Sequence, residues 1–347
     1  MTDQPLRGLG ASLNPPNRYE SLHVEPDDAT GADRTVFYRD TSRSVLAEND
    51  SPDVPFRYSL NPYRGCEHGC VYCFARPTHE YLGFSAGLDF ERRIMVKEDA
   101  PRLLRAALAS PRWQPELVAL SGVTDCYQPV ERKLEITRRC LEVFAEFRNP
   151  VGVVTKSALV ARDADLLGEL ARHGAAHVHC SVTTLDAELA RRLEPRAAQP
   201  EKRLEAIATL AGAGVPVAVL IGPVIAGLND SEIPRILAAA AAAGASSASW
   251  VLLRLPKPVD ELFVRWLEEH VPDRRDRVLH RIQETRAGRL SDATFGRRKR
   301  GQGAYAEQIA ALFEAAARKH RLDRPLPPAS TGAFRRPPQA GDQLRLL

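Results

Sequence analysis

The sequence predicts an α/β protein built on a parallel sheet, and two features of the chain lead to that prediction. Six short runs of apolar and β-branched residues alternate with stretches whose apolar residues recur at helical spacing. Strands and helices that alternate in this way form βαβ units, in which the strands run parallel. An open doubly wound sheet and a barrel-like curl both fit the pattern. In either arrangement, ligands bind at the carboxyl ends of the strands.

The expected strands and helices follow one another along the middle of the chain. The strands are expected at residues 58–65, 116–122, 151–157, 177–185, 215–225 and 247–255. The helices between them are expected within residues 97–110, 135–147, 161–174, 201–214 and 229–244. The last three of these helical patterns end at a glycine, which is a typical stop signal, and the final one begins at Asn229 and Asp230, which are typical helix caps.

The chain is expected to divide into four regions. Residues 1–50 are rich in Pro, Asp, Arg and Gly and are expected to form an irregular N-terminal extension. Residues 51–272 contain the expected strands and are expected to form the α/β domain. Residues 273–324 are expected to form a helical, basic C-terminal segment, and residues 325–347 a Pro-rich, disordered tail.

Composition and charge narrow the class of protein. Of the 347 residues, 44% are hydrophobic and 27% are charged, which is typical of a globular protein. No apolar run reaches the roughly 18 residues of a transmembrane helix, and the N-terminus lacks the apolar core of a signal peptide. We therefore expect a cytoplasmic protein with no membrane partner, whose six cysteines are thiols or metal ligands rather than disulfides. The net charge of +4 allows a nucleic-acid partner without requiring one.

Three of the six cysteines lie in one short, glycine-flanked stretch, GCEHGCVYCFARPTHEY. Cys66, Cys70 and Cys73 directly follow the first expected strand, and a loop of this size can hold three thiolates around one inorganic centre. One interpretation is structural zinc, which takes four protein ligands and would use His68 or His79 as the fourth. Another is a 4Fe–4S cluster, which normally takes four cysteines and with three keeps one iron open. The third is a group of buried thiols that binds no metal.

The C-x-x-x-C-x-x-C spacing, with Tyr72 just before the third cysteine, resembles the signature of the radical S-adenosylmethionine superfamily. Five segments extend the resemblance to the spore photoproduct lyase-like branch, in particular a large bacterial subgroup of it, over residues 50–320. They are NPYRGCEHGCVYCFARPTH, TDCYQPVE, VTKS, RLEPRAAQPEKRL and GPVIAGLND.

The resemblance implies both a fold and a reaction. The fold is a partial (β/α)6 barrel, in agreement with the six expected strands. The three cysteines are implied to hold a 4Fe–4S cluster whose open iron binds S-adenosylmethionine. One electron, from a donor such as flavodoxin or ferredoxin, then cleaves S-adenosylmethionine to a 5′-deoxyadenosyl radical. That radical abstracts a hydrogen atom from the substrate.

The resemblance also suggests cofactor contacts for polar residues at the ends of the later strands. Thr124 and Asp125 follow the second strand and are expected to receive the amino group of S-adenosylmethionine, because an ammonium needs acceptors; the alternative is an Asx turn that ends the strand. Lys156 ends the third strand and is expected to meet the carboxylate or ribose of the cofactor, with a solvated surface lysine as the alternative. Ser181 is expected to bind ribose hydroxyls, and Thr183 shares its face because side chains alternate along a strand.

Two further pairs of polar residues have an open role. His177 and His179 share the face of Ser181 and are expected to be core or rim histidines. Glu194 and Arg196 flank a proline and either clamp a ligand or form a surface ion pair.

Two positions depart from the spore photoproduct lyases. Those enzymes have a cysteine, which returns a hydrogen atom to the repaired thymine, where this chain has Gly122. They have a tyrosine directly after the third cluster cysteine, where this chain has Phe74. Cys126 replaces the missing cysteine only if its loop turns inward, and it is a candidate catalytic residue together with Tyr72. We therefore expect the family's cofactor chemistry without its thymine-dimer substrate.

A basic loop, GRRKRG, precedes the last expected helix. Its four adjacent cations can neutralise phosphates, although charge runs are more often solvated surface and no interleaved aromatic platform accompanies this one. The sequence thus predicts a radical S-adenosylmethionine enzyme with an unidentified substrate, for which a nucleic acid and a lyase-type reaction are candidates. The alternative is a non-catalytic, zinc-stabilised nucleic-acid-binding module.

Overall fold

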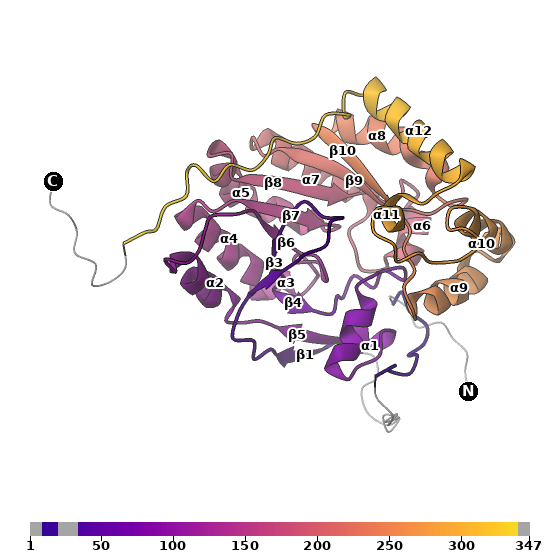
Figure 1. Ribbon diagram of the computed structural model, residues 1–347, viewed down its shortest axis with the longest axis horizontal. Helices are drawn as coiled ribbons and strands as arrows, with labels where there is room; N and C mark the ends of the chain where they lie inside the picture. The colour runs from indigo at the N-terminus through magenta and orange to yellow at the C-terminus, as the bar shows by residue number, and fades with distance from the viewer. Residues whose placement is uncertain (1–8, 20–33, 339–347) are drawn as a thin grey trace.

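The computed structural model describes residues 9–19 and 34–338, and in this part of the chain a seven-stranded sheet forms the centre of the fold (Figure 1). Six of its strands are β3 (Tyr58–Leu60), β6 (Val118–Leu120), β7 (Val151–Thr155), β8 (Ala176–Ser181), β9 (Val217–Val224) and β10 (Ser247–Leu252). They are hydrogen-bonded in this order, and every pair runs parallel. The six predicted strands are therefore confirmed, although all of them are shorter than predicted. Because the strand order never reverses, the sheet is that of a partial (β/α)6 barrel and not of a doubly wound fold.

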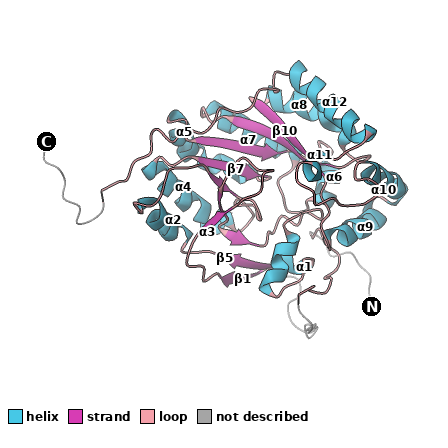
Figure 2. Cartoon of the chain, in the orientation of Figure 1, coloured by secondary structure: helices cyan, strands magenta, loops and turns pink. Residues whose placement is uncertain are grey.

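The helices between successive strands cover the sheet (Figure 2). They are α4 (Ile136–Phe147) after β6, α5 (Ala164–Arg172) after β7, α7 (Pro200–Gly212) after β8 and α8 (Ile233–Ala242) after β9. α2 (Ala100–Ala109) packs against α4. Each of the five helices predicted from the sequence is confirmed at its position.

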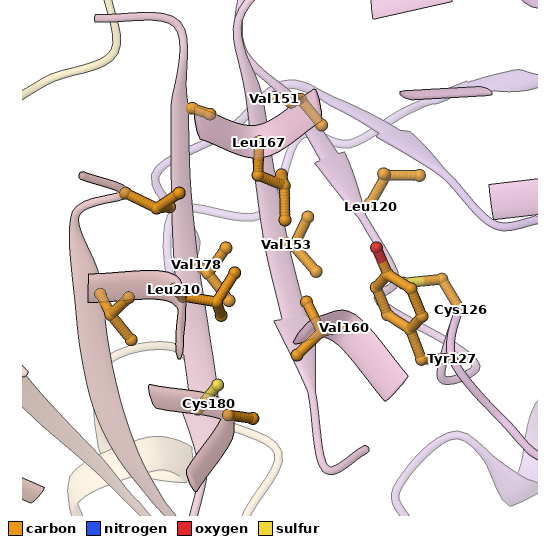
Figure 3. Packing of buried hydrophobic residues seen from close by; sticks show 14 of the residues in the cluster. Leu120, Cys126, Tyr127, Val151, Val153, Val160, Leu167, Val178, Cys180 and Leu210 are labelled. Atoms are coloured by element: carbon orange, nitrogen blue, oxygen red, sulfur yellow. The ribbon is translucent and has the colours of Figure 1, made fainter. Parts of the chain in front are cut away.

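Alternate residues of each strand face these helices. Val153 of β7 and Val178 of β8 belong to the main hydrophobic core together with Leu167 of α5 and Leu210 of α7 (Figure 3). Side chains alternate along a strand, so the intervening residues face the interior of the partial barrel. By this alternation, Lys156 and Ser181, which were predicted as cofactor ligands, belong to the interior face.

Further helices, some of them single 3-10 turns, complete the described fold. They are η1 (Arg76–Leu82), α1 (Leu88–Arg92), α3 (Glu131–Leu134), η2 (Ala158–Asp163), α6 (Ala187–Leu193), η3 (Asp230–Glu232), α9 (Val259–His270), η4 (Pro272–Arg274), α10 (Arg275–Glu284), α11 (Arg297–Arg300) and α12 (Ala304–Lys319). The segment 273–324 is therefore largely helical. None of the described helices combines the length and the apolar character needed to cross a bilayer.

The first fifty residues contain more regular structure than the predicted irregular extension. β2 (Leu46–Glu48) pairs antiparallel with β3 at the edge of the main sheet. β1 (Val36–Arg39) pairs with β5 (Arg93–Val96), which also pairs with β4 (Tyr63–Arg64) in a second, three-stranded sheet. Most residues of β1 and β2 are exposed, so backbone hydrogen bonds and not a hydrophobic pattern define them. Residues 1–8 and 20–33 of the predicted extension lie outside the described residues.

Residues 325–338 of the tail are ordered against the rest of the chain, unlike the predicted disorder. The backbone N–H of Ser330 donates to Gly174 O at 2.8 Å, and that of Arg335 donates to Phe147 O at 2.9 Å. The ring of Phe334 lies 6.3 Å from that of Phe147. The segment thus runs back across the ends of α4 and α5, held by contacts that its Pro-rich composition does not reveal. Residues 339–347 of the predicted tail lie outside the described residues.

Candidate functional site

The cysteine loop, residues 65–75, connects β4 to η1 near the carboxyl end of β3. Gly65 and Gly69 have φ angles of 81° and 68°, in the left-handed region that glycine tolerates best. A side chain at Gly65 would also meet the carbonyl oxygen of Phe90 at 2.9 Å. The N–H of Cys66 donates to that same carbonyl at 2.9 Å. The two glycines therefore allow the tight path that brings the three cysteines close together.

A buried ion pair holds the cysteine loop in shape. Arg76 is fully buried, donates from Nε to Cys70 O at 3.0 Å and pairs with Glu91 Oε1 at 2.5 Å. Glu91 also accepts hydrogen bonds from the N–H groups of Gly10 (2.9 Å) and Ala11 (2.8 Å). A side chain at Gly10 would lie 1.5 Å from a backbone oxygen of the loop. The N-terminal residues 10–11 therefore pack directly on the cysteine loop, and only glycine fits at the point of contact.

The three thiols lie within electrostatic range of one another. Burial raises the pKa of Cys66, Cys70 and Cys73, and the charges of Cys70 and Cys73 further raise the pKa of Cys66. The positive charge of Lys156 lowers the pKa of Cys70 and Cys73 and so opposes the effect of burial. The charge of Arg76 does the same for Cys73. The thiolate is the form that binds metal. Lys156 and Arg76 are therefore placed to stabilise the metal-binding form of the loop.

The histidines considered as a fourth zinc ligand have other contacts. His68 Nδ1 lies 3.4 Å from Asp125 Oδ2. The ring of His79 packs against Phe84 and Phe90 at 5.3 and 5.5 Å, and burial lowers the pKa of His79 to about 4. Among residues 9–19 and 34–338, no group of three or more His, Cys, Asp or Glu side chains is arranged to hold a single metal ion. Three thiols without an imidazole fit an iron–sulfur cluster that keeps one iron open to another ligand.

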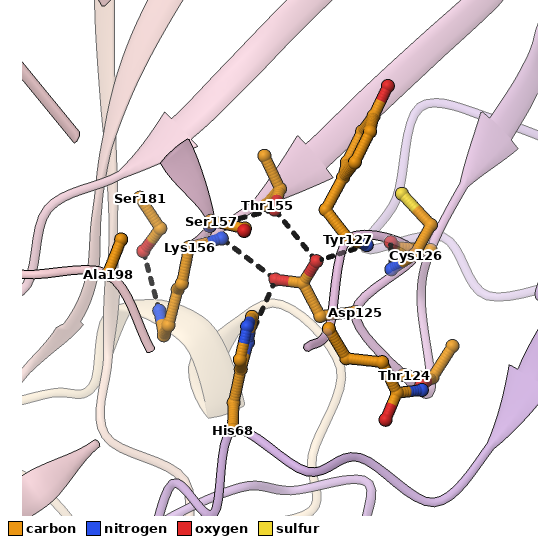
Figure 4. Close-up of polar contacts among 12 residues, drawn as sticks. His68, Thr124, Asp125, Cys126, Tyr127, Thr155, Lys156, Ser157, Ser181 and Ala198 are labelled. Carbon is orange, nitrogen blue, oxygen red and sulfur yellow. Dashed lines mark hydrogen bonds and ion pairs between the residues drawn. The ribbon is translucent and has the colours of Figure 1, made fainter. Parts of the chain in front are cut away.

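Asp125 joins the cysteine loop to the end of β7 (Figure 4). Its Oδ1 accepts hydrogen bonds from Thr155 Oγ1 (2.7 Å) and Tyr127 N (2.9 Å), and its Oδ2 accepts one from Lys156 N (2.8 Å) beside His68. Burial would raise the pKa of Asp125, but His68 and these hydrogen bonds outweigh it and hold the pKa to about 2. The carboxylate is thus ionised and already occupied by protein donors.

The neighbouring Thr124 is also engaged within the protein. Its Oγ1 donates to Gly65 O at 2.6 Å and lies 3.3 Å from Gln128 Nε2. Figure 4 shows Thr124 on the side of Asp125 away from Lys156. The structure therefore does not bring Thr124 together with Lys156 and Ser181, and it gives Thr124 and Asp125 the geometry of positioning groups.

Lys156 and Ser181 do come together, at the carboxyl ends of β7 and β8. Lys156 Nζ donates to Ser181 Oγ and to Gly222 O, both at 2.6 Å. The same ammonium lies 3.8 Å from Glu194 Oε1 and 5.9 Å from the centre of the Tyr72 ring. The predicted surface alternative for Lys156 is wrong, because its side chain is only 15% exposed. It lies in a cluster of polar side chains, here called the polar group, that also contains Tyr72, Ser181 and Glu194.

Glu194 is the centre of the polar group. It pairs with Arg203, and both side chains are 2% exposed or less. Its Oε1 accepts hydrogen bonds from Thr183 Oγ1 at 2.6 Å and from the hydroxyl of Tyr72. Burial would raise the pKa of Glu194, but Arg203, Lys156 and the two hydroxyls hold it to about 2. Of the two roles predicted for Glu194, a clamp or a surface ion pair, the surface pair is wrong because the side chain is buried. Arg203 is not among the residues predicted for the site, although RLEPRAAQPEKRL contains both residues.

Cys126 lies elsewhere, in the main hydrophobic core. Its side chain is fully buried with Leu120 and Tyr127 (Figure 3), and burial raises its pKa well above the usual range. Its N–H donates to Ser121 Oγ at 3.0 Å. Figure 4 shows it on the far side of Asp125 from Lys156. The loop therefore does not turn inward, and Cys126 and Tyr72 are not brought together.

Comparisons with known proteins agree with this geometry. A family model described as the Radical SAM superfamily matches residues 60–240. An uncharacterised protein of Mycobacterium tuberculosis strain H37Rv is 38% identical over 246 residues, which cover 70% of this chain and 72% of the relative. An uncharacterised protein of Methanocaldococcus jannaschii is 29% identical over 51% of this chain and 63% of its own.

Solved structures extend the comparison to the fold. The structure of spore photoproduct lyase complexed with dinucleoside spore photoproduct matches with a TM-score of 0.58. The match covers 82% of this chain and 79% of that chain at 15% sequence identity. At this identity the similarity concerns the fold alone.

Proposed function

The chain belongs to the radical SAM superfamily, and we propose that it is a hydrogen-abstracting enzyme whose reaction takes place at the carboxyl ends of its barrel strands. Its cofactors are a 4Fe–4S cluster and S-adenosylmethionine. When bound, they supply a 5′-deoxyadenosyl radical that removes a hydrogen atom from the substrate. Cys66, Cys70 and Cys73 would hold the cluster.

One observation carries the proposal: the buried polar group around Lys156 adjoins the cysteine loop. Tyr72, which stands between two of the cysteines in sequence, lies 5.9 Å from Lys156 Nζ. The charge of Lys156 also acts on Cys70 and Cys73. A single small molecule could therefore contact the cluster and Lys156 at once, as a ligand with a carboxylate and a ribose would need.

Lys156 and Ser181 would make the direct contacts to S-adenosylmethionine. The ammonium of Lys156 suits its carboxylate as a point charge, and the hydroxyl of Ser181 suits a ribose hydroxyl. Both side chains now bond to each other and to Gly222 O, so ligand binding would exchange these contacts for new ones. We assign Asp125 and Thr124 a positioning role, because Asp125 holds Lys156 N and His68 in place.

Of the two candidate catalytic residues, we propose Tyr72. Burial and Glu194 raise its pKa well above the usual range, so its hydroxyl stays protonated and donates a hydrogen bond to Glu194. The buried position of Cys126 in the core argues against direct contact between its thiol and a substrate.

The substrate and the cellular setting complete the proposal. Phe74 and Gly122 replace the tyrosine and cysteine expected in the lyases, so we propose a substrate other than a thymine dimer, with nucleic acid as the first class to test and a lyase-type reaction as one option. We also propose a cytoplasmic enzyme that receives electrons from a donor such as flavodoxin or ferredoxin.

The experiment is reconstitution of the purified protein with iron and sulfide in the absence of oxygen. We expect about four irons per chain and a brown chromophore. Cys70→Ala should lose both, whereas Cys140→Ala, which changes a buried core cysteine outside the loop, should keep both. Stoichiometric zinc in place of iron would overturn the proposal and support the zinc-stabilised nucleic-acid-binding module.

A further inference from the structure

Two large aromatic side chains remain exposed beside the mouth of the barrel. Phe74 is 48% exposed and Phe295 is 54% exposed. An arginine lies over each ring, with Arg254 Cζ 5.1 Å from the centre of Phe74 and Arg298 Cζ 4.3 Å from the centre of Phe295. Exposed aromatic rings next to cations are the combination that binds single-stranded nucleic acid, in which bases stack and phosphates carry charge.

Arg254 is held beside the cysteine loop by its neighbours in sequence. Leu253 and Leu255 are buried in one hydrophobic cluster with Cys70 and Tyr72. Arg254 stands between them, just after the carboxyl end of β10, and its side chain is directed to the ring of Phe74. Phe74 itself directly follows the third cysteine. The Phe74–Arg254 pair therefore lies at the same end of the barrel as the proposed reaction.

The basic loop is anchored next to this pair. Arg286 is 2% exposed and donates to Leu253 O at 2.6 Å and to Arg297 O at 3.0 Å. Within the described part of the chain its Nε has no hydrogen-bond partner. The carboxylate of Asp53 accepts a hydrogen bond from the N–H of Gly296 at 2.7 Å and forms an ion pair with Arg298. The backbone carbonyl oxygen of Asp53 accepts a hydrogen bond from the ammonium of Lys299. Two of the four cations of the loop are therefore already engaged with Asp53.

Positive charge exceeds negative charge at this place. Among residues 9–19 and 34–338, the guanidinium of Arg254 makes no hydrogen bond and no ion pair with a carboxylate. Burial and the nearby Arg298 lower the pKa of Arg254, although the charge of Asp53 opposes them. Burial and Arg254 likewise lower the pKa of Arg286 to about 10, despite Asp292. An anion placed on Arg254 would supply the missing counter-charge.

We propose that Phe74 and Arg254, with the basic loop 296–301 beside them, bind one nucleotide of a single-stranded nucleic-acid substrate, with its base on Phe74 and its phosphate on Arg254. The proposal rests on the proposed function, because it assigns a substrate class to the same barrel mouth. It also changes the interpretation of the basic loop. The sequence showed no aromatic platform within the loop. In the fold, Phe295 and Phe74 lie beside it and can serve as the platform, and Phe74 comes from a distant part of the sequence.

The test measures binding by the reconstituted, oxygen-free enzyme. A fluorescent single-stranded oligonucleotide is titrated at several salt concentrations. Phe74→Ala should weaken binding by about fivefold or more, the usual range for the loss of one stacked base, and Phe74→Trp should restore it. Arg254→Ala should reduce the salt slope by about 0.7, the value for one phosphate contact on a single strand. Arg172→Ala, an exposed residue at the end of α5 and so at the opposite end of the barrel, should change neither.

Four outcomes separate the possibilities. Wild-type-like binding by both Phe74→Ala and Arg254→Ala, with iron content retained, would overturn the proposal. A mononucleotide that binds as tightly as the oligonucleotide, with the same variant effects, would identify a free nucleotide as the source of the phosphate and overturn the nucleic-acid substrate. Formation of 5′-deoxyadenosine is measured in the same samples. Cleavage without oligonucleotide binding rejects this inference alone, and binding without cleavage rejects the proposed function alone.

Discussion

Replacement of Arg203 by methionine tests the buried charges of the site most sharply. Arg203 and Glu194 are 2% and 1% exposed and pair with each other. Arg203 also donates to Ser181 O at 3.0 Å and to Ala198 O at 2.6 Å. Its loss therefore leaves a carboxylate and two carbonyls in the interior without their main donor.

The expected magnitude follows from the partners that remain. Removing one member of a buried ion pair costs about 3–5 kcal/mol, because the other charge stays buried and uncompensated. Lys156 lies 3.8 Å from Glu194 and replaces part of the lost charge. We therefore expect a loss of about 3 kcal/mol in the free energy of unfolding, at the lower end of the range. The pKa of Glu194, now held to about 2 with the help of Arg203, should rise in this variant.

The assay is urea unfolding of the apoprotein at pH 7 in a double-mutant cycle of Arg203→Met and Glu194→Gln. Because Glu194→Gln removes the unpaired charge, the double variant should be more stable than the sum of the single changes by about 1–3 kcal/mol. Additive effects, or a loss below about 1 kcal/mol for Arg203→Met, would refute the central role given to this pair.

Three other changes have expected outcomes. Lys156→Met should weaken binding of S-adenosylmethionine by at least about tenfold in equilibrium dialysis, because a hydrogen bond to a charged group is lost, and unchanged affinity would remove Lys156 from the site. Gly10→Ala should speed the loss of iron to a chelator, since its side chain would meet the cysteine loop at 1.5 Å, while Gly212→Ala, with no atom near its added carbon, serves as the control and should not. Burial lowers the pKa of His179 to about 4, below its unfolded value of about 6.5, so only the unfolded state gains a proton between these pH values. Stability should therefore fall as the pH drops from 6.5 to 4, and His179→Gln should reduce the fall by at most about 3 kcal/mol.

The sequence predicted the parts of the fold that hydrophobic burial specifies. The strands of the barrel and the helices between them bury alternate or periodic residues, so their positions could be read from the pattern. β1 and β2 are mostly exposed and exist because they pair with strands already in place. The segment around Ser330 is held by backbone hydrogen bonds to distant residues, which composition does not encode.

The site was predictable where spacing carries chemistry. The cysteine triplet stands out in the local sequence, and the cofactor role of the lysine at the end of β7 follows from the family resemblance; both roles stay predictions. Arg203 could not be predicted as a site residue, because a basic residue in a helix is usually solvated. Only the packing of α7 places it on Glu194. Asp125 was expected to bind a ligand, but protein donors occupy it. The pairing of Phe74 with Arg254 depends on the tertiary fold alone.

Formation of 5′-deoxyadenosine tests the central claim most directly. The reconstituted protein is reduced in the absence of oxygen with S-adenosylmethionine, and the product is quantified by chromatography. We expect the wild-type protein and Cys140→Ala to form 5′-deoxyadenosine and Cys70→Ala to form none. Product from Cys70→Ala at the wild-type rate, or no product from a wild-type protein that carries its full iron content, would contradict the account.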